Sequence, residues 1–318
     1  MVTITSLYIL SGVVLVWLSA EKLERYSIAS ASKYGISPFL IGSTIIAFGT
    51  SAPEMLTSLF AVLDNKPVMV VGNVIGSNIA NIALVFGLTL GILSIKAKNI
   101  SSTSKVSFNL FILILSTFLL LIIIALDPFN FYSSIILLIS LIIVLLIWYK
   151  KSDGKIEEKQ TSKEKLVLFK LILSLISLIF AAWLITQGAL NILNNFGLEQ
   201  LFVGYTVLAI GTSIPEIAAS FALTLKGRYE AVAGTIIGSN IFNGLLVMAI
   251  PGLFNRNNIL PTGFEYENWI PLLLLLLAVT IIFCIYIFLI NKRERKASML
   301  LAIFLISSYF LSLALAYK

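Results

Sequence analysis

The chain contains no histidine and only one cysteine among its 318 residues. Without an imidazole base, Ser-His-Asp and Cys-His catalysis and histidine-bound zinc are excluded. The single cysteine, Cys284, excludes an intramolecular disulfide and a cysteine-rich metal cluster. Because Cys284 lies in an apolar run, packing is its expected role. We therefore expect neither an enzyme of these classes nor a resident cofactor.

Charged side chains are also scarce. They make up 12% of the sequence, whereas an average soluble domain carries about 25%. Apolar runs of about 18 or more residues, each long enough to cross a bilayer, recur along the chain. The sequence therefore predicts an all-α polytopic membrane protein. An intramembrane hydrolase is excluded because the predicted spans hold no Asp, His or Lys near their middle.

Hydropathy, turn signals and charges together predict ten transmembrane helices. The first lacks a preceding basic segment, so we interpret it as an uncleaved span and not as a signal peptide. The first and sixth exceed about 20 residues and are expected to tilt or to extend beyond the bilayer. The predicted spans are 4–32, 37–63, 67–94, 106–126, 129–149, 166–194, 199–225, 229–254, 269–290 and 297–317.

Lysine and arginine placement predicts the orientation of these spans, since such residues accumulate on the cytoplasmic side. If the N-terminus lies outside, 19 of the 22 basic residues fall in inner segments. The remaining three are Lys66, Arg256 and Lys318. We therefore expect a multi-pass protein of the cell membrane with both termini outside and the hydrophilic linker 150–165 in the cytoplasm. This distribution explains the net charge of +7 without a nucleic-acid partner.

Two blocks of sequence recur at a single offset of 162 residues. Residues 42–61 match 204–223 at nine of twenty positions, and 72–87 match 234–249 at nine of sixteen. One ungapped offset over both blocks indicates duplication, so the signature repeats are 42–87 and 204–249.

The duplication divides the chain into a first half, 1–149, the linker 150–165 and a second half, 166–318. Each half holds five predicted spans, so the second must enter the membrane in the opposite direction. Ten helices in two inverted-topology five-helix repeats are the architecture of many secondary transporters, whose binding site lies at the midplane. Repeated small residues would also suit helix packing alone, but packing does not require the repeated glutamates.

Two glutamates differ from the other acidic residues. Of the fifteen, thirteen lie in the linker, in loops or towards span ends, whereas Glu54 and Glu216 are mid-span and repeat-related. An ionisable group at membrane depth marks a functional site by default. Because no lysine or arginine lies mid-span to neutralise these glutamates, we expect their partner to be a cation from solution.

Oxygen donors surround both glutamates in the sequence. Pro53 and Pro215 remove the helical donor of the carbonyl groups four residues earlier, and the carbonyls of Ala47 and Ala209 are expected to turn inward where the helices are interrupted. An all-oxygen set suits Ca²⁺ and Na⁺ better than Zn²⁺ or Cu²⁺. Packing or interhelical hydrogen bonding is the alternative role for each serine and asparagine. The hydroxyl and amide donors are Thr50, Ser51, Ser77, Asn81, Thr212, Ser213, Ser239 and Asn243.

At these residues the sequence resembles the sodium/calcium exchanger family, within the calcium/cation antiporter superfamily. The pairs GTSAPE (49–54) with GSNIAN (76–81) and GTSIPE (211–216) with GSNIFN (238–243) match the family's signature repeats. The resemblance extends over nearly the whole chain and is closest to compact prokaryotic members. It implies metal sites built from Ala47, Thr50, Ser51, Glu54, Ser77, Asn81, Ala209, Thr212, Ser213, Glu216, Ser239 and Asn243.

The resemblance also implies a function, which is Na⁺/Ca²⁺ antiport by alternating access. Exchange of about three Na⁺ per Ca²⁺ would move one net charge, worth about 2.3 kcal/mol per 100 mV. Glu54 and Glu216 would bind Ca²⁺, and the carbonyl oxygens of Ala47 and Ala209 would contribute to Na⁺ sites. Asn243 stands where several members carry aspartate, which argues against K⁺ co-transport.

The alternative is a Ca²⁺/H⁺ exchanger on the same scaffold, since glutamates can carry protons. The motifs favour Na⁺, and in either case we expect protons to compete with the metal ions. The lipid bilayer is the other expected partner, and we expect the chain to act as a monomer. A structural or receptor protein would show no ⁴⁵Ca²⁺ flux.

Overall fold

The computed structural model of the chain describes residues 2–33, 47–96, 104–151, 166–225, 229–255, 261, 269–289 and 295–316. Within these ranges every regular element is a helix, as the composition predicts. Most of the predicted linker, 152–165, lies outside the described residues. So do residues 37–46, which begin the second predicted span and include the start of the first signature repeat, and residues 226–228 in the second.

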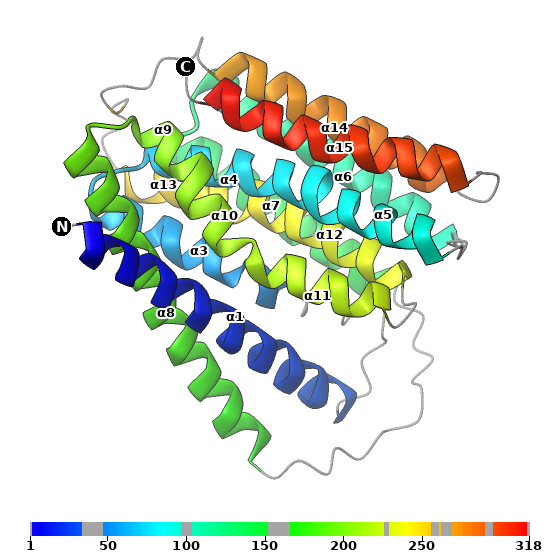
Figure 1. Ribbon diagram of the computed structural model, residues 1–318, viewed down its shortest axis with the longest axis horizontal. Coiled ribbons are helices and arrows are strands. Elements are labelled where there is room, and N and C mark those ends of the chain that lie inside the picture. Colours follow the sequence, from blue (N-terminus) through cyan, green and yellow to red (C-terminus); the bar gives the residue numbers. More distant parts are fainter. Residues whose placement is uncertain are drawn as a thin grey trace.

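The helices of the first half fall in its predicted spans (Figure 1). One long run is helical throughout but changes its winding, because a π-helical segment separates two α-helices. The elements in chain order are α1 (Val2–Lys33), α3 (Ala47–Leu63), α4 (Val68–Ile79), η2 (Ala80–Phe86), α5 (Gly87–Lys96), α6 (Ser104–Leu126) and α7 (Phe131–Lys151).

The second half is divided into more pieces. Its first helix is long and unbroken, whereas the repeat-bearing segments are interrupted by π-helical and 3-10 turns. The elements are α8 (Val167–Phe196), α9 (Gln200–Val203), η3 (Gly204–Leu208), α10 (Ala209–Thr212), α11 (Ile214–Leu225), α12 (Tyr229–Leu245), η4 (Val247–Ala249), α13 (Ile250–Phe254), α14 (Ile270–Leu289) and α15 (Arg295–Ala316).

The molecule carries apolar side chains outside and polar ones inside. Phe111, Phe288 and Phe310 are exposed, while both Glu54 and Glu216 are buried. Seven helices among the described residues are long and apolar enough to cross a membrane, and two shorter apolar helices accompany them. Large exposed apolar surfaces are rare in soluble monomers. The chain is therefore a multi-pass membrane protein.

Helices α4 and α12, which carry the second block of each repeat, lie at the centre. The apolar segments 68–94 and 232–254 are 94% and 89% buried over their most apolar stretch, whereas the other five long segments are at most 53% buried. Helix α4 also contacts α12 directly. The centre of the bundle is thus built by both halves of the sequence.

Glycines on α4 and on η3 allow α4 to approach α9 and the π-helical segment η3 of the second half. A Cβ atom on Gly72 would lie 2.5 Å from the carbonyl oxygen of Leu201, and one on Gly76 would lie 2.6 Å from that of Tyr205. On the other side, a Cβ atom on Gly204 would lie 2.2 Å from the carbonyl oxygen of Met69. Only hydrogen fits at these positions, so small residues let the two halves meet at backbone distance.

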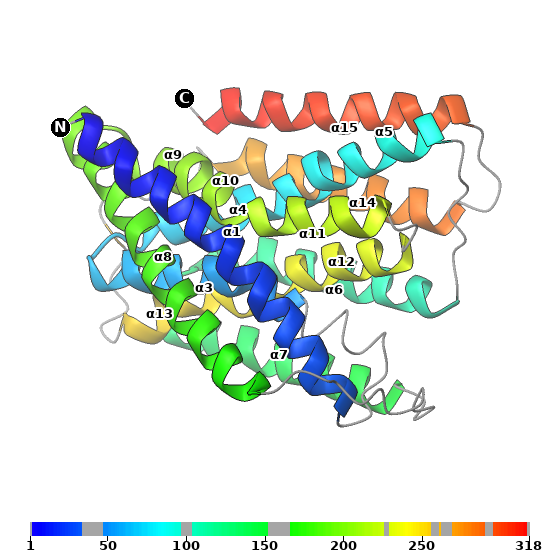
Figure 2. The ribbon, with the colours of Figure 1, turned by 60° about the horizontal axis from the view of Figure 1, so that its bottom comes forward.

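Helices α1 and α8 form an oblique pair at one side of the bundle (Figures 1 and 2). Their mutual contact is the most extensive between any two described elements. It is built on reciprocal glycine contacts, in which Gly12 faces Ile185 and Gly188 faces Ile9. This pair also touches α3 and α11, the helices that carry the two mid-span glutamates.

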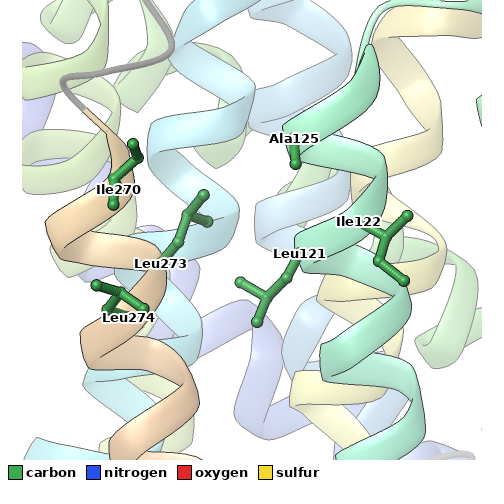
Figure 3. Close-up of a pocket in the computed structure, with 6 residues that line it drawn as sticks. All are labelled: Leu121, Ile122, Ala125, Ile270, Leu273 and Leu274. Carbon is green, nitrogen blue, oxygen red and sulfur yellow. The ribbon is translucent and has the colours of Figure 1, made fainter.

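An apolar crevice of about 250 Å³ lies between α6 and α14 (Figure 3). None of its lining side chains carries an oxygen, so they offer no ligand to a cation. Leu274, one of its walls, is largely exposed on the outer surface of the bundle. The crevice therefore belongs to the apolar surface and is separate from the polar centre. Its lining is Leu121, Ile122, Ala125, Ile270, Leu273 and Leu274.

Candidate cation-binding site

The two mid-span glutamates lie in the interior, one on α3 and one on α11. Glu54 is 0% exposed and Glu216 is 1% exposed. They are close enough for their negative charges to interact. The hydroxyl of Ser213 donates to Oε1 of Glu54 at 3.3 Å, while Oε2 of Glu54 and both carboxylate oxygens of Glu216 have no partner among the described residues. Three buried carboxylate oxygens are therefore free to bind a cation.

Each carboxylate faces hydroxyl groups from the other half of the chain. Thr212 lies beside Glu54 together with Ser213, and Thr50 lies beside Glu216. Because Thr50 and Thr212 are repeat-related, as are the two glutamates, this cross-facing arrangement follows the symmetry of the duplication. The predicted site residues of the two halves thus form one cluster.

The neighbouring hydroxyl groups depart from that symmetry. The Thr50 and Ser239 hydroxyl oxygens are 3.1 Å apart and share a hydrogen bond. The repeat counterpart of Ser239, Ser77, instead donates to Oδ1 of Asn73 at 3.4 Å. Ser51 is buried, and its hydroxyl has no partner among the described residues. Ser51 therefore remains a candidate oxygen donor, and so does Ser77, because a hydroxyl that donates its hydrogen keeps its lone pairs.

The prolines act differently in the two halves. The second half is interrupted as expected, because α10 ends and Ser213 leaves helical geometry, with φ −81° and ψ 2°, just before Pro215. In the first half the expected interruption is not seen, since α3 continues through Pro53. Pro53 has no amide hydrogen for the carbonyl oxygen of Gly49, yet α3 is not broken there. One turn later the Thr57 hydroxyl donates to the Pro53 carbonyl oxygen at 2.9 Å.

The two predicted carbonyl ligands already accept hydrogen bonds from the protein. The oxygen of Ala47 receives the Thr50 hydroxyl at 3.2 Å, and the oxygen of Ala209 receives the Ser213 amide at 3.1 Å. A carbonyl oxygen has two lone pairs, so that of Ala209 keeps one for a cation. Ala47 is the first residue of the α-helix α3, so its oxygen also lies where the helix pattern brings the Ser51 amide, and it would have to give up one of these two bonds to bind a cation. Ala47 and Ala209 are fully or almost fully buried.

The two predicted amide ligands differ in their contacts. Asn81 donates through Nδ2 to Oδ1 of Asn240 at 3.0 Å, which leaves its own Oδ1 without a partner among the described residues. Neither amide atom of Asn243 has such a partner. Both side chains are fully buried, where an unpaired polar group costs free energy. A bound cation would satisfy the amide oxygens.

Three further asparagines lie close to the predicted ligands and were not singled out in the sequence. Asn73 donates to the carbonyl oxygen of Glu54 at 3.4 Å and to the Ser58 hydroxyl at 3.0 Å. Asn78 and Asn240 each donate to the other's backbone carbonyl oxygen at 3.3 Å. Asn78 and Asn240 lie 162 residues apart in the repeated GSN motif, so the repeat could have pointed to both. Asn73 could not be found in this way, because threonine stands at the equivalent position of the second repeat.

The chemistry of the cluster fits a hard cation. Among the described residues no three His, Cys, Asp or Glu side chains gather into a metal site, so any ligand shell must be completed by neutral oxygens. Hydroxyl, amide and carbonyl oxygens beside two carboxylates are the donors that Ca²⁺ prefers. Two buried, uncompensated carboxylates are costly, and a cation between them removes that cost.

Comparison with known proteins relates the chain to membrane exchangers. The profile of the family described as "Sodium/calcium exchanger protein" matches residues 4–150 and 166–318. The chain is 35% identical over 257 residues to the "Putative antiporter CaxA" of Alkalimonas amylolytica, covering 78% of this chain and 80% of that protein. It is 26% identical over 298 residues to the sodium/calcium exchanger MaX1 of Methanosarcina acetivorans, covering 80% and 84%.

Solved structures of the sodium-calcium exchanger NCX_Mj share the same fold. With the structure soaked in 100 mM Na⁺ and 10 mM Sr²⁺, the chain has 28% sequence identity and a TM-score of 0.71, and the match covers 99% of both chains. The similarity therefore extends over the whole bundle and includes the helices that carry Glu54 and Glu216.

Proposed function

The chain belongs to the sodium/calcium exchanger protein family, and from this premise we propose that it exchanges Na⁺ for Ca²⁺ across the cell membrane by alternating access. One observation carries the proposal. Glu54 and Glu216, contributed by the two sequence repeats, lie together in the interior with three carboxylate oxygens that have no partner among the described residues.

The proposed Ca²⁺ site lies between these two carboxylates. Thr50 and Thr212 complete it because each lies beside the glutamate of the other half. The carbonyl oxygens of Ala47 and Ala209 are proposed to take part in Na⁺ sites. The Ser77 hydroxyl donates its hydrogen to Asn73 and keeps its oxygen lone pairs for a cation. The remaining proposed ligands are Ser51, Ser77, Asn81, Ser213, Ser239 and Asn243.

The charge of the site explains why this would be an exchanger and not a leak. Two carboxylates give a charge of −2, which one Ca²⁺ or several Na⁺ neutralise. An empty site leaves both charges uncompensated in a medium of low dielectric constant. Movement between outward-open and inward-open states is therefore favoured when the site is loaded and disfavoured when it is empty.

The oblique pair of α1 and α8 is the proposed moving element. It packs against α3 and α11, which carry the glutamates, while α4 and α12 are buried at the centre. Glycine contacts such as Gly12 against Ile185 pack the two helices closely, so that they can move as one unit. Displacement of this pair along the central helices would open the site first to one side and then to the other.

Two inverted five-helix halves, with both termini outside, are the proposed topology. The reciprocal hydrogen bonds between Asn78 and Asn240 support it, because two residues at the repeat offset contact each other in the same way. Labelling with a membrane-impermeant thiol reagent tests the orientation. In a Cys284→Ala background, Lys66→Cys should react from outside and Lys150→Cys should not. The reverse pattern would invert the assignment.

The central experiment measures ⁴⁵Ca²⁺ uptake into Na⁺-loaded proteoliposomes. Glu54→Gln and Glu216→Gln each remove one charge at nearly constant volume and should abolish uptake. Glu199→Gln is the matched control, because Glu199 is an exposed glutamate that precedes α9, and it should transport normally. Uptake by either interior variant at the wild-type rate would disprove the carboxylate assignment.

Proton coupling is tested in the same vesicles. Carboxylates also bind protons, so a Ca²⁺/H⁺ exchanger would drive uptake from a pH gradient without Na⁺. We expect no such uptake. Lowering the pH on both sides should instead raise the Ca²⁺ concentration at half-maximal rate, because protons compete for the same oxygens. Uptake driven by the pH gradient alone would favour the alternative.

A further inference from the structure

A short chain of hydrogen bonds links the backbone of α4 to the side chain of Asn81 through Asn240 of α12. Nδ2 of Asn240 donates to the carbonyl oxygen of Asn78 at 3.3 Å. Oδ1 of Asn240 accepts from Nδ2 of Asn81 at 3.0 Å. All three side chains are at most 4% exposed, so water does not compete for these bonds.

The donor and acceptor chemistry of this chain allows one orientation only. A backbone carbonyl oxygen accepts and cannot donate, so the Asn240 atom that faces it must be the amide nitrogen. The other amide atom of Asn240 is then an oxygen, which can receive only a donor. Asn81 must therefore present its own nitrogen to Asn240, and its oxygen is directed away, buried and without a partner among the described residues.

We propose that Asn240 is a positioning residue, which holds the Asn81 amide so that its oxygen is presented to the transported cation. The inference rests on the proposed function, because it takes Asn81 as a ligand. Without Asn240, the amide of Asn81 could turn over, and its nitrogen, which carries partial positive charge, would face the cation. The hydrogen bond therefore favours cation binding through an atom that need not touch the cation.

The equivalent hydrogen bond in the other repeat, between Asn78 and Asn243, is not formed. Asn78 donates to the carbonyl oxygen of Asn240 at 3.3 Å, so by the same reasoning its Oδ1 could accept from Nδ2 of Asn243. Both of those atoms lack a partner among the described residues. The backbone explains the difference, since Asn81 lies in the wider π-helical turn η2 whereas Asn243 lies in α12.

Asn78 is therefore a matched control for Asn240. Each side chain donates one hydrogen bond to the other's carbonyl oxygen at the same distance, but only Asn240 also holds a proposed ligand. Asn78→Ala and Asn240→Ala should lower the thermal stability of the cation-free protein to a similar extent. Their effects on cation affinity should differ.

The test is a double-mutant cycle on the purified full-length protein. The dissociation constants of Na⁺ alone and of Ca²⁺ alone are measured by calorimetry for the wild type, Asn78→Ala, Asn81→Ala, Asn240→Ala and Asn81→Ala/Asn240→Ala. Loss of a residue that orients a metal ligand costs about 10- to 100-fold in affinity. We expect Asn240→Ala to weaken at least one cation about tenfold and Asn78→Ala to change neither more than about twofold.

The double variant provides the decisive comparison. If Asn240 acts through Asn81, the double variant should bind no more weakly than Asn81→Ala alone. Equal effects of Asn78→Ala and Asn240→Ala, or multiplied effects of Asn81→Ala and Asn240→Ala, would overturn the proposal. If Asn240→Ala does not fold, Asn240→Leu serves in its place, because leucine has a similar shape and can neither donate nor accept a hydrogen bond.

These binding constants separate the two proposals. A wild-type protein that binds cations but does not exchange them would refute the proposed function, and the cycle would still decide the role of Asn240. A wild-type protein that binds neither cation would overturn both.

Discussion

At the scale of single residues, the two carboxylates are stabilised unequally by the protein. Glu54 receives one hydrogen bond from the Ser213 hydroxyl, and its backbone carbonyl oxygen receives bonds from Thr57 and Asn73. Both carboxylate oxygens of Glu216 lack a partner among the described residues. Glu216 therefore depends more strongly on the cation than Glu54 does, even though the two residues occupy equivalent positions in the repeats.

Replacement of Ser213 by alanine should weaken Ca²⁺ binding. The substitution removes a proposed oxygen ligand and the hydrogen bond to Glu54 in one step. A hydrogen bond to a charged group is worth about 1.5 kcal/mol or more, which corresponds to about a tenfold change. We expect the Ca²⁺ concentration at half-maximal uptake to rise by about that factor in proteoliposomes.

Ser220→Ala is the matched control for this prediction. Ser220 lies on the same helix, α11, is 1% exposed, and its hydroxyl has no partner among the described residues. Removal of an unpaired buried hydroxyl is close to neutral or stabilising. If Ser213→Ala and Ser220→Ala behave alike in the uptake assay, Ser213 does not contribute to the site.

The repeat predicted the main members of the candidate site but not their partners. Glu54 and Glu216 could be found because a mid-span carboxylate occurs at the same position of both repeats. The role of Asn240 could not be found, because it depends on how α4 crosses α12. The different hydrogen bonds of Ser77 and Ser239 could not be predicted either. Ser77 donates to Asn73, whereas Ser239 bonds to Thr50. Thr235, at the position equivalent to Asn73, forms no such bond to Ser239.

At the scale of elements, helical winding was the least predictable property. Hydropathy located the long apolar segments well, as the bounds of α6 and α14 illustrate. It could not locate η2, because a π-helical turn changes the backbone without changing the apolar character of the segment. Pro53 and Pro215 illustrate the same limit, since equal sequence motifs continue a helix in one half and end it in the other.

The close contact between α4 and η3 leads to a prediction about stability. A Cβ atom on Gly204 would lie 2.2 Å from the backbone oxygen of Met69, and a backbone atom cannot turn aside as a flexible side chain can. Overpacking of this kind costs about 1–3 kcal/mol. Gly204→Ala should therefore melt at a lower temperature than the wild type when thermal unfolding is followed in detergent.

Gly91→Ala provides the comparison. Gly91 lies inside α5, and a Cβ atom there would meet nothing within 4 Å among the described residues. Alanine also favours the helix over glycine by up to about 1 kcal/mol. This variant should melt at or above the wild-type temperature. Equal melting of the two alanine variants would contradict the view that the α4–η3 contact is closely packed.

At the scale of the whole molecule, two halves of similar sequence have different internal contacts. The first half has η2 and the Asn73–Ser58 bond, and its Asn81 bonds to Asn240 of the other half. The second half has a broken helix at Ser213 and an unengaged Asn243. Alternating access in inverted repeats requires two states in which the halves exchange roles. Different contacts in the two halves are what we expect of one such state, in which each half has a different role.

The net charge moved in each cycle provides a test of the whole mechanism. If three Na⁺ exchange for one Ca²⁺, one positive charge crosses with the Na⁺, and a potential of 100 mV contributes about 2.3 kcal/mol. Since about 1.4 kcal/mol is a factor of ten, the final Ca²⁺ gradient should change about fiftyfold per 100 mV. Potentials set with K⁺ and valinomycin, at fixed Na⁺ gradient, would measure this change in proteoliposomes.

The direction of the effect follows from the direction of transport. Because the vesicles release Na⁺ as they take up Ca²⁺, an interior-positive potential should increase Ca²⁺ accumulation, and Glu54→Gln should show no response. A Ca²⁺ gradient that ignores the potential would instead mean electroneutral exchange, with two monovalent cations for each Ca²⁺, and would disprove the three-to-one coupling.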